Sequence, residues 1–296
     1  MRFAYTVPED KKIRVIIDSD TACEADDPFA IAQALMSPKL IVRAIVAEHF
    51  ALEGSMQKSY EAIRRLLDSM HMDANILHGE PWPLEAGAPA SEGVRFIIEE
   101  ALREDARPLF VLCLGAVTNL ARAFREAPEI MARMTVVTIG GHGYDVSPIP
   151  FREFNFGNDV DAANYLLSCG ATIWQVPVPA YGSMRTGLTE LQMKVAPCGD
   201  AGRYLFEQMV AYNESPAAGW TPGESWSLGD SPAVAVTLDF SCGQYHDQAA
   251  RFVNPDTSYS SKETGRTVRV YDTVDSRYVL EDFFCKLALN FPPEGR

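Results

Sequence analysis

An aliphatic segment that leads directly into a dense group of acids constrains this chain more than any other feature. Residues 13–17 (IRVII) have the composition of a buried strand, and the ten residues that follow, 18–27, contain five acidic side chains. Carboxylates this close repel one another unless a positive charge lies among them. Oxygen ligands suit Ca2+ or Mg2+ better than Zn2+. The sequence therefore predicts a divalent metal site at the end of the first strand.

The spacing within this acidic segment predicts how its side chains are arranged. Asp18 and Asp20 are two positions apart on the presumed strand and are expected to point the same way. Asp26 and Asp27 open the next segment, with Asp27 as the N-cap of a helix that runs to about Met36. The positive end of that helix would reduce the repulsion among the acids. Strand ends of open α/β sheets are common ligand sites, which favours a functional site here.

Three of the five acids could also have a purely structural role. Asp27 could act only as a helix cap, Glu24 could be a solvated loop charge, and Asp18 could tie down the loop backbone. Asp20 and Asp26 have no such simple explanation. The cluster as a whole therefore favours a site over a set of unrelated charges.

Composition limits the class of protein. With 296 residues, 47% of them hydrophobic and 22% charged, the chain can bury a substantial core and is most simply one domain spanning residues 1–296. A net charge of -14 argues against a nucleic-acid partner, because binding phosphates requires clustered Lys and Arg. The acidity is typical of a soluble protein.

Cysteine usage and hydropathy indicate the compartment. The six cysteines lie far apart without a C-x-x-C pair, and several fall in apolar surroundings such as residues 110–113, which predicts reduced, buried thiols. The N-terminus lacks a signal-peptide pattern, and no apolar run approaches the roughly 18 residues that span a membrane. We therefore expect a cytoplasmic protein without a membrane partner.

Strand and helix patterns alternate from the first strand to residue 176, which predicts a mostly parallel sheet. Strands are expected at 40–47, 109–114, 135–139 and 172–176, and helices at 56–70, 92–102, 117–124 and 160–168. Beyond residue 177 the pattern loosens, and long loops of this kind often carry function. The expected segments there are a helix at 202–212, a loop at 213–229, a helix after Asp230, a hairpin at 245–271 and a helix at 274–289.

Four sequence blocks, in this order, resemble the nucleoside hydrolase family. They are the acidic segment 18–27, GAVTN at 115–119, EFNFGNDVDAA at 153–163 and GDSPAVA at 229–235. The resemblance implies an α/β, Rossmann-like fold with a mostly parallel central sheet and helices on both faces. It also implies a calcium-dependent N-ribohydrolase of purine or pyrimidine salvage, which cleaves a nucleoside to free base and ribose, and a homodimer or homotetramer.

The resemblance implies a set of metal ligands by position. Asp20 looks like the residue that both ligates Ca2+ and takes a proton from the attacking water. Asp27 and Asp230 look like further ligands, and the backbone carbonyl of Leu114 matches a fourth. A cation bound there makes water more acidic and fixes the ribose hydroxyls beside it.

The resemblance also implies the residues that hold the substrate. Asp26 matches the residue that binds the ribose diol, and Glu153 and Asn155 match groups that hold sugar hydroxyls, with Phe154 packed beside them. His49 follows a strand end where family members place a Gly-Asn pair, which makes it the best histidine candidate for contact with the ligand.

Two departures from the family pattern bear on the chemistry. The acidic loop is two residues longer than the usual form, so that Glu24 could enter the metal shell. Gly229 stands where many members carry a His that protonates the departing base. Without that His, aromatic rings that stack on the base could assist its departure, and Trp226 and Trp82 are the candidates, although ordinary packing would equally explain both.

Three polar residues within the matched blocks are assigned structural roles. Asn119 is expected to cap the helix that follows it, and Asp159 and Asp161 are expected to be acids at a helix N-terminus.

Two other functions remain open on the sequence. A protein that binds a ribosyl compound with lost or weak turnover would explain the missing His. The run Asp18-Ser19-Asp20-Thr21 after an apolar strand also resembles the nucleophile motif of haloacid dehalogenase-like phosphatases, which use Mg2+. That family has no use for the Asp26-Asp27 pair or for the block at 153–155. The base, the pentose and any 5′ substituent are not specified by these motifs.

Overall fold

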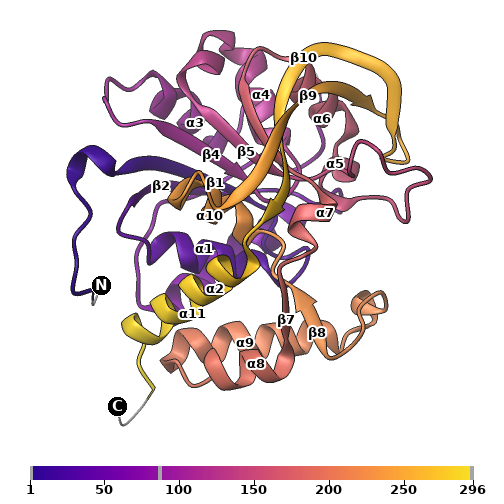
Figure 1. The fold of residues 1–296 in the computed structure, drawn as a ribbon. Helices are drawn as coiled ribbons and strands as arrows, with labels where there is room; N and C mark the ends of the chain where they lie inside the picture. The colour runs from indigo at the N-terminus through magenta and orange to yellow at the C-terminus, as the bar shows by residue number, and fades with distance from the viewer. Residues whose placement is uncertain (1–2, 86–88, 294–296) are drawn as a thin grey trace.

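A central sheet organises the molecule, which is described here by a computed structural model for residues 3–85 and 89–293. Its strands are β1 (Ile13–Ser19), β2 (Leu40–Ala47), β3 (Ile76–His78), β4 (Leu109–Cys113), β5 (Thr135–Ile139), β6 (Thr172–Val176), β9 (Gly243–Val253) and β10 (Tyr259–Val274). They lie in the order β3-β2-β1-β4-β5-β6-β10-β9 (Figure 1). Neighbours pair in parallel except β9 and β10, which form an antiparallel hairpin.

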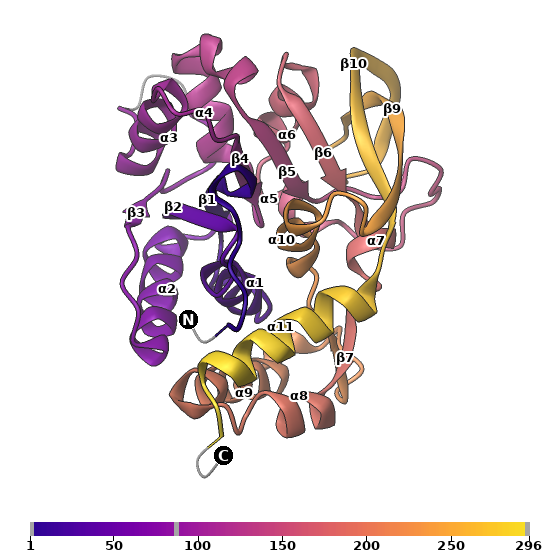
Figure 2. The same ribbon diagram turned by 60° about the vertical axis from the view of Figure 1, so that its left-hand side comes forward.

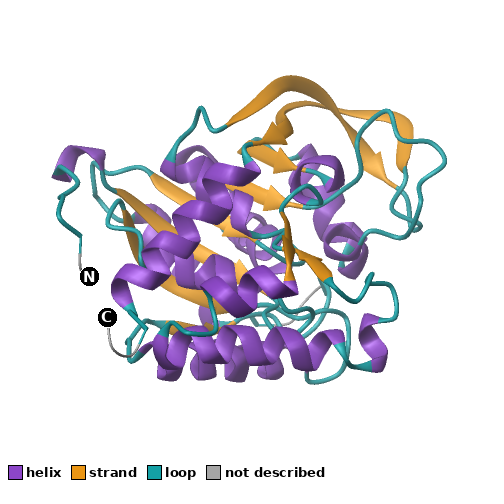
Figure 3. Ribbon diagram, turned by 60° about the horizontal axis from the view of Figure 1, so that its bottom comes forward, coloured by secondary structure: helices purple, strands orange, loops and turns teal. Residues whose placement is uncertain are grey.

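Helices cover both faces of the sheet (Figures 2 and 3). One face packs against α1 (Asp27–Leu35), α2 (Ser55–Met70), α10 (Ser231–Leu238) and α11 (Ser276–Asn290), and the other against α3 (Glu92–Leu102), α4 (Thr118–Glu126) and α6 (Val160–Ser168). Strand β1 is buried along its whole length and alternates between the two cores, with Val15 and Ile17 on one side and Ile16 on the other. The expected α/β fold class is confirmed.

The topology places the site. From β1 the chain moves outward to β2 and β3, then crosses to the other side of β1 to form β4. Strand order therefore reverses between β1 and β4, and in open parallel sheets a ligand crevice forms outside the carboxyl ends of the strands at such a point. The acidic segment follows β1, and Leu114 and Gly115 follow β4. Both segments thus reach the same crevice.

A smaller unit borders this crevice; its first helix lies beside the sheet, and the rest lies below the sheet in Figure 1. It comprises α7 (Val178–Tyr181), β7 (Arg185–Gly187), α8 (Leu188–Lys194), α9 (Gly199–Asn213) and β8 (Ser225–Ser227). Strands β7 and β8 pair antiparallel, so the loop expected at 213–229 ends in a strand. The unit is tied to the main body through α9, whose residues Leu205 and Met209 lie in the same core as α1 and α2.

The expected elements agree closely with those observed, although some bounds differ; helix α9, for example, begins at Gly199 rather than at residue 202. The strands at 40–47, 135–139 and 172–176 and the helices at 92–102 and 160–168 have the expected bounds. Helix α1 begins at Asp27, one residue earlier than expected, because Asp26 and not Asp27 occupies the N-cap position. The side chain of Asp26 makes no capping hydrogen bond. Asp27 is not the N-cap, since its side chain turns toward Ser19, whose hydroxyl donates a 2.6 Å hydrogen bond to Asp27 Oδ1. The final helix begins at Ser276 rather than at residue 274.

The expectations on thiols and membrane spans can also be compared with the structure. All six cysteines are unpaired, and four of them are buried, whereas Cys23 is half-buried and Cys285 is exposed. Across residues 3–85 and 89–293, none of the helices has both the length and the apolarity that a bilayer crossing requires.

Candidate active site and metal centre

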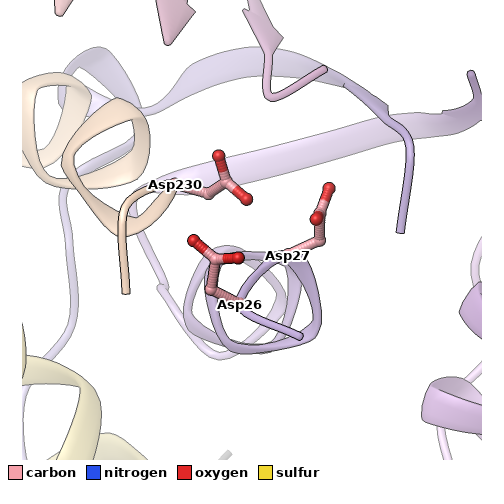
Figure 4. A group of neighbouring side chains, drawn as sticks. All are labelled: Asp26, Asp27 and Asp230. Atoms are coloured by element: carbon pink, nitrogen blue, oxygen red, sulfur yellow. The ribbon is translucent and has the colours of Figure 1, made fainter. Parts of the chain in front are cut away.

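Three aspartates meet at the ends of two helices. Asp26 and Asp27 stand at the start of α1 and Asp230 immediately precedes α10, and one carboxylate oxygen of each lies within 4.8 Å of the others. Figure 4 shows the three carboxylates turned toward a common space. The Gly229 amide donates a 2.8 Å hydrogen bond to Asp26 Oδ2, which joins the two segments directly. The structure therefore brings together the acidic segment and the distant Asp230.

Asp20 lines the same cavity and is 2% exposed. Its Oδ2 atom is buried and has no hydrogen-bond partner among the described residues. Gly115 lies so close that a Cβ atom there would collide with the Asp20 carboxyl carbon. A glycine at this position allows the β4 loop to approach Asp20, and an unpaired buried oxygen is costly unless a cation or a ligand satisfies it.

Burial raises the pKa of every carboxyl group in the cluster, and the charge of Asp27 raises the pKa of Asp20, Asp26 and Asp230 further. Burial, followed by the charge of Asp27, raises the pKa of Asp26 to about 7, and burial raises that of Asp27 to about 6. Burial, with Asp27 as the leading neighbouring charge, places the pKa values of Asp20 and Asp230 well above the ordinary range. No Lys, Arg or His is among the described residues that line this cavity. The donor set thus fits a hard divalent cation, which would restore the charged forms.

Three further expected residues line the same cavity. The Leu114 carbonyl oxygen lies at the cavity wall and accepts a 2.7 Å hydrogen bond from Asn155 Nδ2, which also donates to the Ile139 carbonyl. Glu153 caps the short helix α5 (Phe154–Asn158), with its two carboxylate oxygens accepting from the amides of Asn155 and Phe156. Each of these contacts fixes a side chain that the sequence assigned to the sugar.

The site consists of two adjoining cavities. The inner cavity has a volume of about 50 Å3 and is lined by Asp20, Cys23, Glu24, Asp26, Asp27, Leu114, Ile139, Glu153, Phe154, Asn155, Tyr181, Gly229 and Asp230. The outer cavity has a volume of about 440 Å3 and is lined by Glu24, Asp26, Phe151, Phe154, Val178, Tyr181, Gly182, Arg185, Trp220, Ser227 and Gly229. The five residues common to both are Glu24, Asp26, Phe154, Tyr181 and Gly229. A small polar chamber therefore opens into a larger, mainly apolar one.

Trp226 and His49 lie away from both cavities. Trp226 is 2% exposed and packs in the core against Tyr212, behind Trp220, which is 54% exposed and lines the outer cavity. Trp82 is not among the lining residues of either cavity. The tryptophan at the site is therefore Trp220, which precedes the expected Trp226 by six positions. The two serines that flank Trp226 form an alternating polar-apolar-polar pattern, which could have indicated an inward-facing Trp.

His49 is fully buried in a structural hydrogen-bond chain. Its Nδ1 atom accepts from the Ala51 amide, so Nε2 carries the proton and donates to Thr118 Oγ1 at 2.8 Å. Thr118 in turn donates to Asp159 Oδ2 at 2.7 Å. Burial lowers the pKa of His49 to about 4, which keeps the ring neutral. This chain links the β2 end to the start of α6 rather than to a ligand.

Asn119 and Asp18 form a polar layer behind the site. Asn119 is the second residue of α4 and not its cap; its Nδ2 donates to Asp18 Oδ1 at 2.8 Å and to Glu48 Oε2 at 3.0 Å. Its Oδ1 accepts from the Glu80 amide at 2.6 Å. The expected role of Asn119 as a cap is therefore wrong, whereas Asp159 does cap α6 by accepting from the Ala162 amide. Asp18 supports the acidic turn from behind and does not line the cavity.

Several lining residues were outside the predicted site. Glu24 lines both cavities but is not part of the three-aspartate group. Tyr181 lines both cavities beside Gly229, where a Cβ atom would lie 3.2 Å from its ring. Phe151 carried no sequence signal, since its loop has no regular pattern. The ring of Tyr181 thus borders the position where relatives carry a His.

Three kinds of similarity to known proteins agree with this geometry. The plant nucleoside hydrolase PpNRh1 has a similar fold, with a TM-score of 0.77 and 19% identity over 95% of this chain and 99% of that one. The purine-preferring ribonucleoside hydrolase from Gardnerella vaginalis gives a TM-score of 0.73 at 21% identity, over 94% and 99% of the two chains. At this level of identity both comparisons support the fold alone.

A curated relative extends the similarity in sequence. The pyrimidine-specific ribonucleoside hydrolase RihA of Salmonella enteritidis PT4 (strain P125109) is 26% identical over 185 residues, which span 54% of this chain and 58% of that protein. The match therefore covers little more than half of the relative.

A family model decides the assignment. The model for the inosine-uridine preferring nucleoside hydrolases matches residues 15–281, which include every block that carried the resemblance. The match argues against the haloacid dehalogenase-like phosphatase that the sequence left open. The chain belongs to the inosine-uridine preferring nucleoside hydrolase family.

Proposed function

We propose that this protein is a calcium-dependent N-ribohydrolase that cleaves the N-glycosidic bond of a nucleoside, or of a related ribosyl compound, to give free base and ribose. The observation that carries the proposal is the convergence of Asp26, Asp27 and Asp230 on one buried cavity, beside Asp20, in a chain of this family.

The cation would be held by the carboxylates of Asp20, Asp27 and Asp230 and by the Leu114 carbonyl oxygen. The unpartnered Oδ2 of Asp20 and the raised pKa values of the other two carboxyls support this set, because each indicates a missing positive charge. All-oxygen ligands of this kind suit Ca2+. When bound, the cation supplies the charge that makes a neighbouring water molecule more acidic and fixes ribose hydroxyls in the inner cavity.

The side chains that line the inner cavity have different roles in the proposed reaction. Asp20 takes the proton from the attacking water, because it lines the cavity proposed for the ribose and one of its carboxylate oxygens has no partner among the described residues. Asp26, Glu153 and Asn155 orient the sugar hydroxyls, which keeps the anomeric carbon beside the nucleophile. Positive charge that develops on the ribose ring as the base departs is stabilised by the same carboxylates.

Departure of the base takes place toward the outer cavity. With Gly229 in place of the His of many relatives, the groups that face the base are Trp220, Phe154 and Tyr181. Burial, followed by the charge of Glu153, places the pKa of Tyr181 well above its usual range, so its hydroxyl stays protonated. Tyr181 can therefore donate a hydrogen bond to the leaving base, and the other rings provide an aromatic surface for it.

Release of free base from a panel of purine and pyrimidine nucleosides tests this activity. Purified protein is treated with a chelator, then assayed with Ca2+ or Mg2+ added back, and base is quantified by chromatography. Base release that depends on Ca2+ supports the proposal. If no nucleoside releases base in the presence of Ca2+, the assignment as a hydrolase is wrong.

A ribosyl-binding protein with lost or weak turnover is the second candidate, because Gly229 leaves the usual proton donor of the base absent. Calorimetric titration with nucleosides in Ca2+ distinguishes the two. Tight binding with no base release during long incubation would favour the binding protein.

The proposal extends to the oligomeric state, the compartment and the partners of the protein. A homodimer or homotetramer in the cytoplasm, with a nucleoside as its small-molecule partner and no nucleic-acid partner, agrees with the family and with the net charge of -14. Sedimentation analysis of the purified protein measures the oligomeric state.

A further inference from the structure

The outer cavity contains a basic side chain that the proposed hydrolysis does not use. Arg185 is the one basic residue among the described residues that line either cavity. Four of the ten other lining residues are aromatic, among them Phe151, Phe154 and Trp220. Arg185 is exposed, so its guanidinium can donate hydrogen bonds to a ligand that enters this cavity.

The guanidinium of Arg185 has no ion pair and no hydrogen bond with any described residue. The chain carries 40 acidic and 26 basic side chains, so a carboxylate partner would have been readily available. The backbone at this point is held by the β7–β8 pairing, in which Arg185 stands opposite Ser227, itself a lining residue. The backbone of Arg185 is thus held in place, whereas its guanidinium has no partner among the described residues.

The path from the inner cavity leads to this side chain. A ligand with its ribose among the aspartates would pass Phe154 and Tyr181, which border both cavities, before it reaches the wall that carries Arg185. Glu24 and Asp26 border the same path and would repel a negative group on the ligand. One cation at the outer wall is the group that would offset this repulsion.

We propose that Arg185 binds an anionic group of the substrate, so that the preferred substrate is a ribosyl compound with a carboxylate on its base or a phosphate at its 5′ position. The inference rests on the proposed hydrolase for the placement of the ribose. A planar guanidinium forms paired hydrogen bonds with either group. Charge-assisted hydrogen bonds of this strength correspond to about 10- to 100-fold in kcat/KM.

Matched substrates and variants test the inference. Uridine, orotidine and uridine 5′-monophosphate differ only in an anionic group, on the base or on the sugar, and inosine with inosine 5′-monophosphate repeats the sugar comparison for a purine. The ratio of kcat/KM for each anionic compound to that for its neutral counterpart is measured with Ca2+ in the wild type, Arg185→Gln and Arg185→Lys. Arg277→Gln is the control, since Arg277 is exposed on α11 and lines neither cavity.

We expect the ratio for one anionic compound to fall about 10- to 100-fold in Arg185→Gln, less in Arg185→Lys, and not in Arg277→Gln. The compound affected shows whether the anion belongs to the base or to the sugar. An unchanged ratio in Arg185→Gln overturns the inference while leaving the hydrolase in place.

If the wild type hydrolyses none of these compounds, the proposed activity fails and binding decides the inference. Calorimetric dissociation constants of the same pairs are then compared between the wild type and Arg185→Gln. A preference for the anionic compound that disappears in Arg185→Gln supports the inference. Equal affinities, or no binding of any compound at millimolar concentration, overturn it.

Discussion

At the scale of single residues, Asp20 differs from the other aspartates that line the inner cavity in having a buried oxygen without a partner in the described part of the chain. Asp27 accepts a hydrogen bond from Ser19, and Asp26 accepts one from Gly229. Asp20 has a buried oxygen with no partner among the described residues. An atom in this state is costly in a folded protein unless a ligand completes it, which makes Asp20 the residue with the clearest functional requirement.

Replacing Asp20 by Asn should remove the proton acceptor while preserving the size of the side chain. We expect kcat for base release to fall about 100- to 10,000-fold, the usual contribution of a general base. The matched control is Asp161→Asn, because Asp161 is exposed on α6 and lines neither cavity. Equal activity of the two variants would contradict the role of Asp20.

Asn119 should stabilise the acidic turn from behind. Asn119→Leu removes the hydrogen bonds to Asp18, Glu48 and Glu80, and an unsatisfied buried group costs about 1–3 kcal/mol. We expect the free energy of unfolding in urea to fall by about 3 kcal/mol and the affinity for Ca2+ to fall with it. Asn75→Ala, at an exposed position, should change neither quantity by more than about 0.5 kcal/mol.

At the scale of elements, the starts of α1 and α10 face each other across the aspartate cluster and pack together. The partial positive charge at each helix start favours anionic groups there, and this effect is confined to the first turn. It does not cancel the cost of burial, since the pKa values of Asp26 and Asp27 remain raised to about 7 and about 6. The stability of this junction should therefore depend on both pH and metal.

The pH dependence of the metal-free protein has a definite sign. The folded pKa values of Asp26 and Asp27 lie above the unfolded value near 3.9, so the folded state binds more protons. The associated stability is present below about pH 4 and is lost as the pH rises through 6 to 7. We expect Tm with chelator to fall by roughly 5 °C or more between pH 5 and pH 8.

Calcium should reverse this trend, because protons and the cation compete for the same oxygens. The rise in Tm on adding Ca2+ should be larger at pH 8 than at pH 5 and smaller in Asp27→Asn. Differential scanning calorimetry measures both. A calcium effect that is independent of pH would indicate binding elsewhere on the molecule.

Two tryptophans close in sequence have different roles, because Trp226 lies in strand β8 and Trp220 lies in the loop before it. Trp226 lies in the core, so Trp226→Ala should reduce the free energy of unfolding by about 3–5 kcal/mol. Trp220 lines the outer cavity and is largely exposed, so Trp220→Ala should raise KM for the nucleoside with little loss of stability. Denaturation curves and steady-state kinetics of both variants test the distinction. A loss of stability in Trp220→Ala equal to that in Trp226→Ala would contradict it.

At the scale of the whole molecule, the chain is expected to unfold as one domain. The smaller unit shares its core with the helices of the main body through Leu205 and Met209 of α9. We therefore expect a single transition in calorimetry, with equal calorimetric and van't Hoff enthalpies. Two resolved transitions would show that the smaller unit folds independently.

Much of the architecture could be predicted from the sequence because its signals are local. The alternation up to residue 176 depends on the period of apolar residues within each segment, and those bounds agree to within two residues. The pairing of β7 with β8 could not be predicted, because each strand has three residues and its partner lies about forty positions away. Asp230 could be assigned to the site only from the family resemblance, since no local pattern relates it to residues 18–27.

The same reasoning explains the errors within the site. Trp220 and Trp226 are equally aromatic in the sequence, and only the pairing of β8 decides which of them faces inward. The role of Asn119 depends on Asp18 of β1 and on Glu48, which follows β2. Sequence patterns identify residue types at strand ends, whereas partners across the sheet depend on the assembled fold.

The hydrogen bond from Gly229 to Asp26 joins segments 203 positions apart and has a consequence for biosynthesis. On the ribosome, the acidic turn leaves the exit tunnel long before Asp230 has been translated. In the nascent chain the acidic turn is therefore exposed to water. The chamber closes only when α10 docks on α1. Acquisition of the ion would then be among the last steps of maturation, and a chain arrested before this point would be unable to retain it.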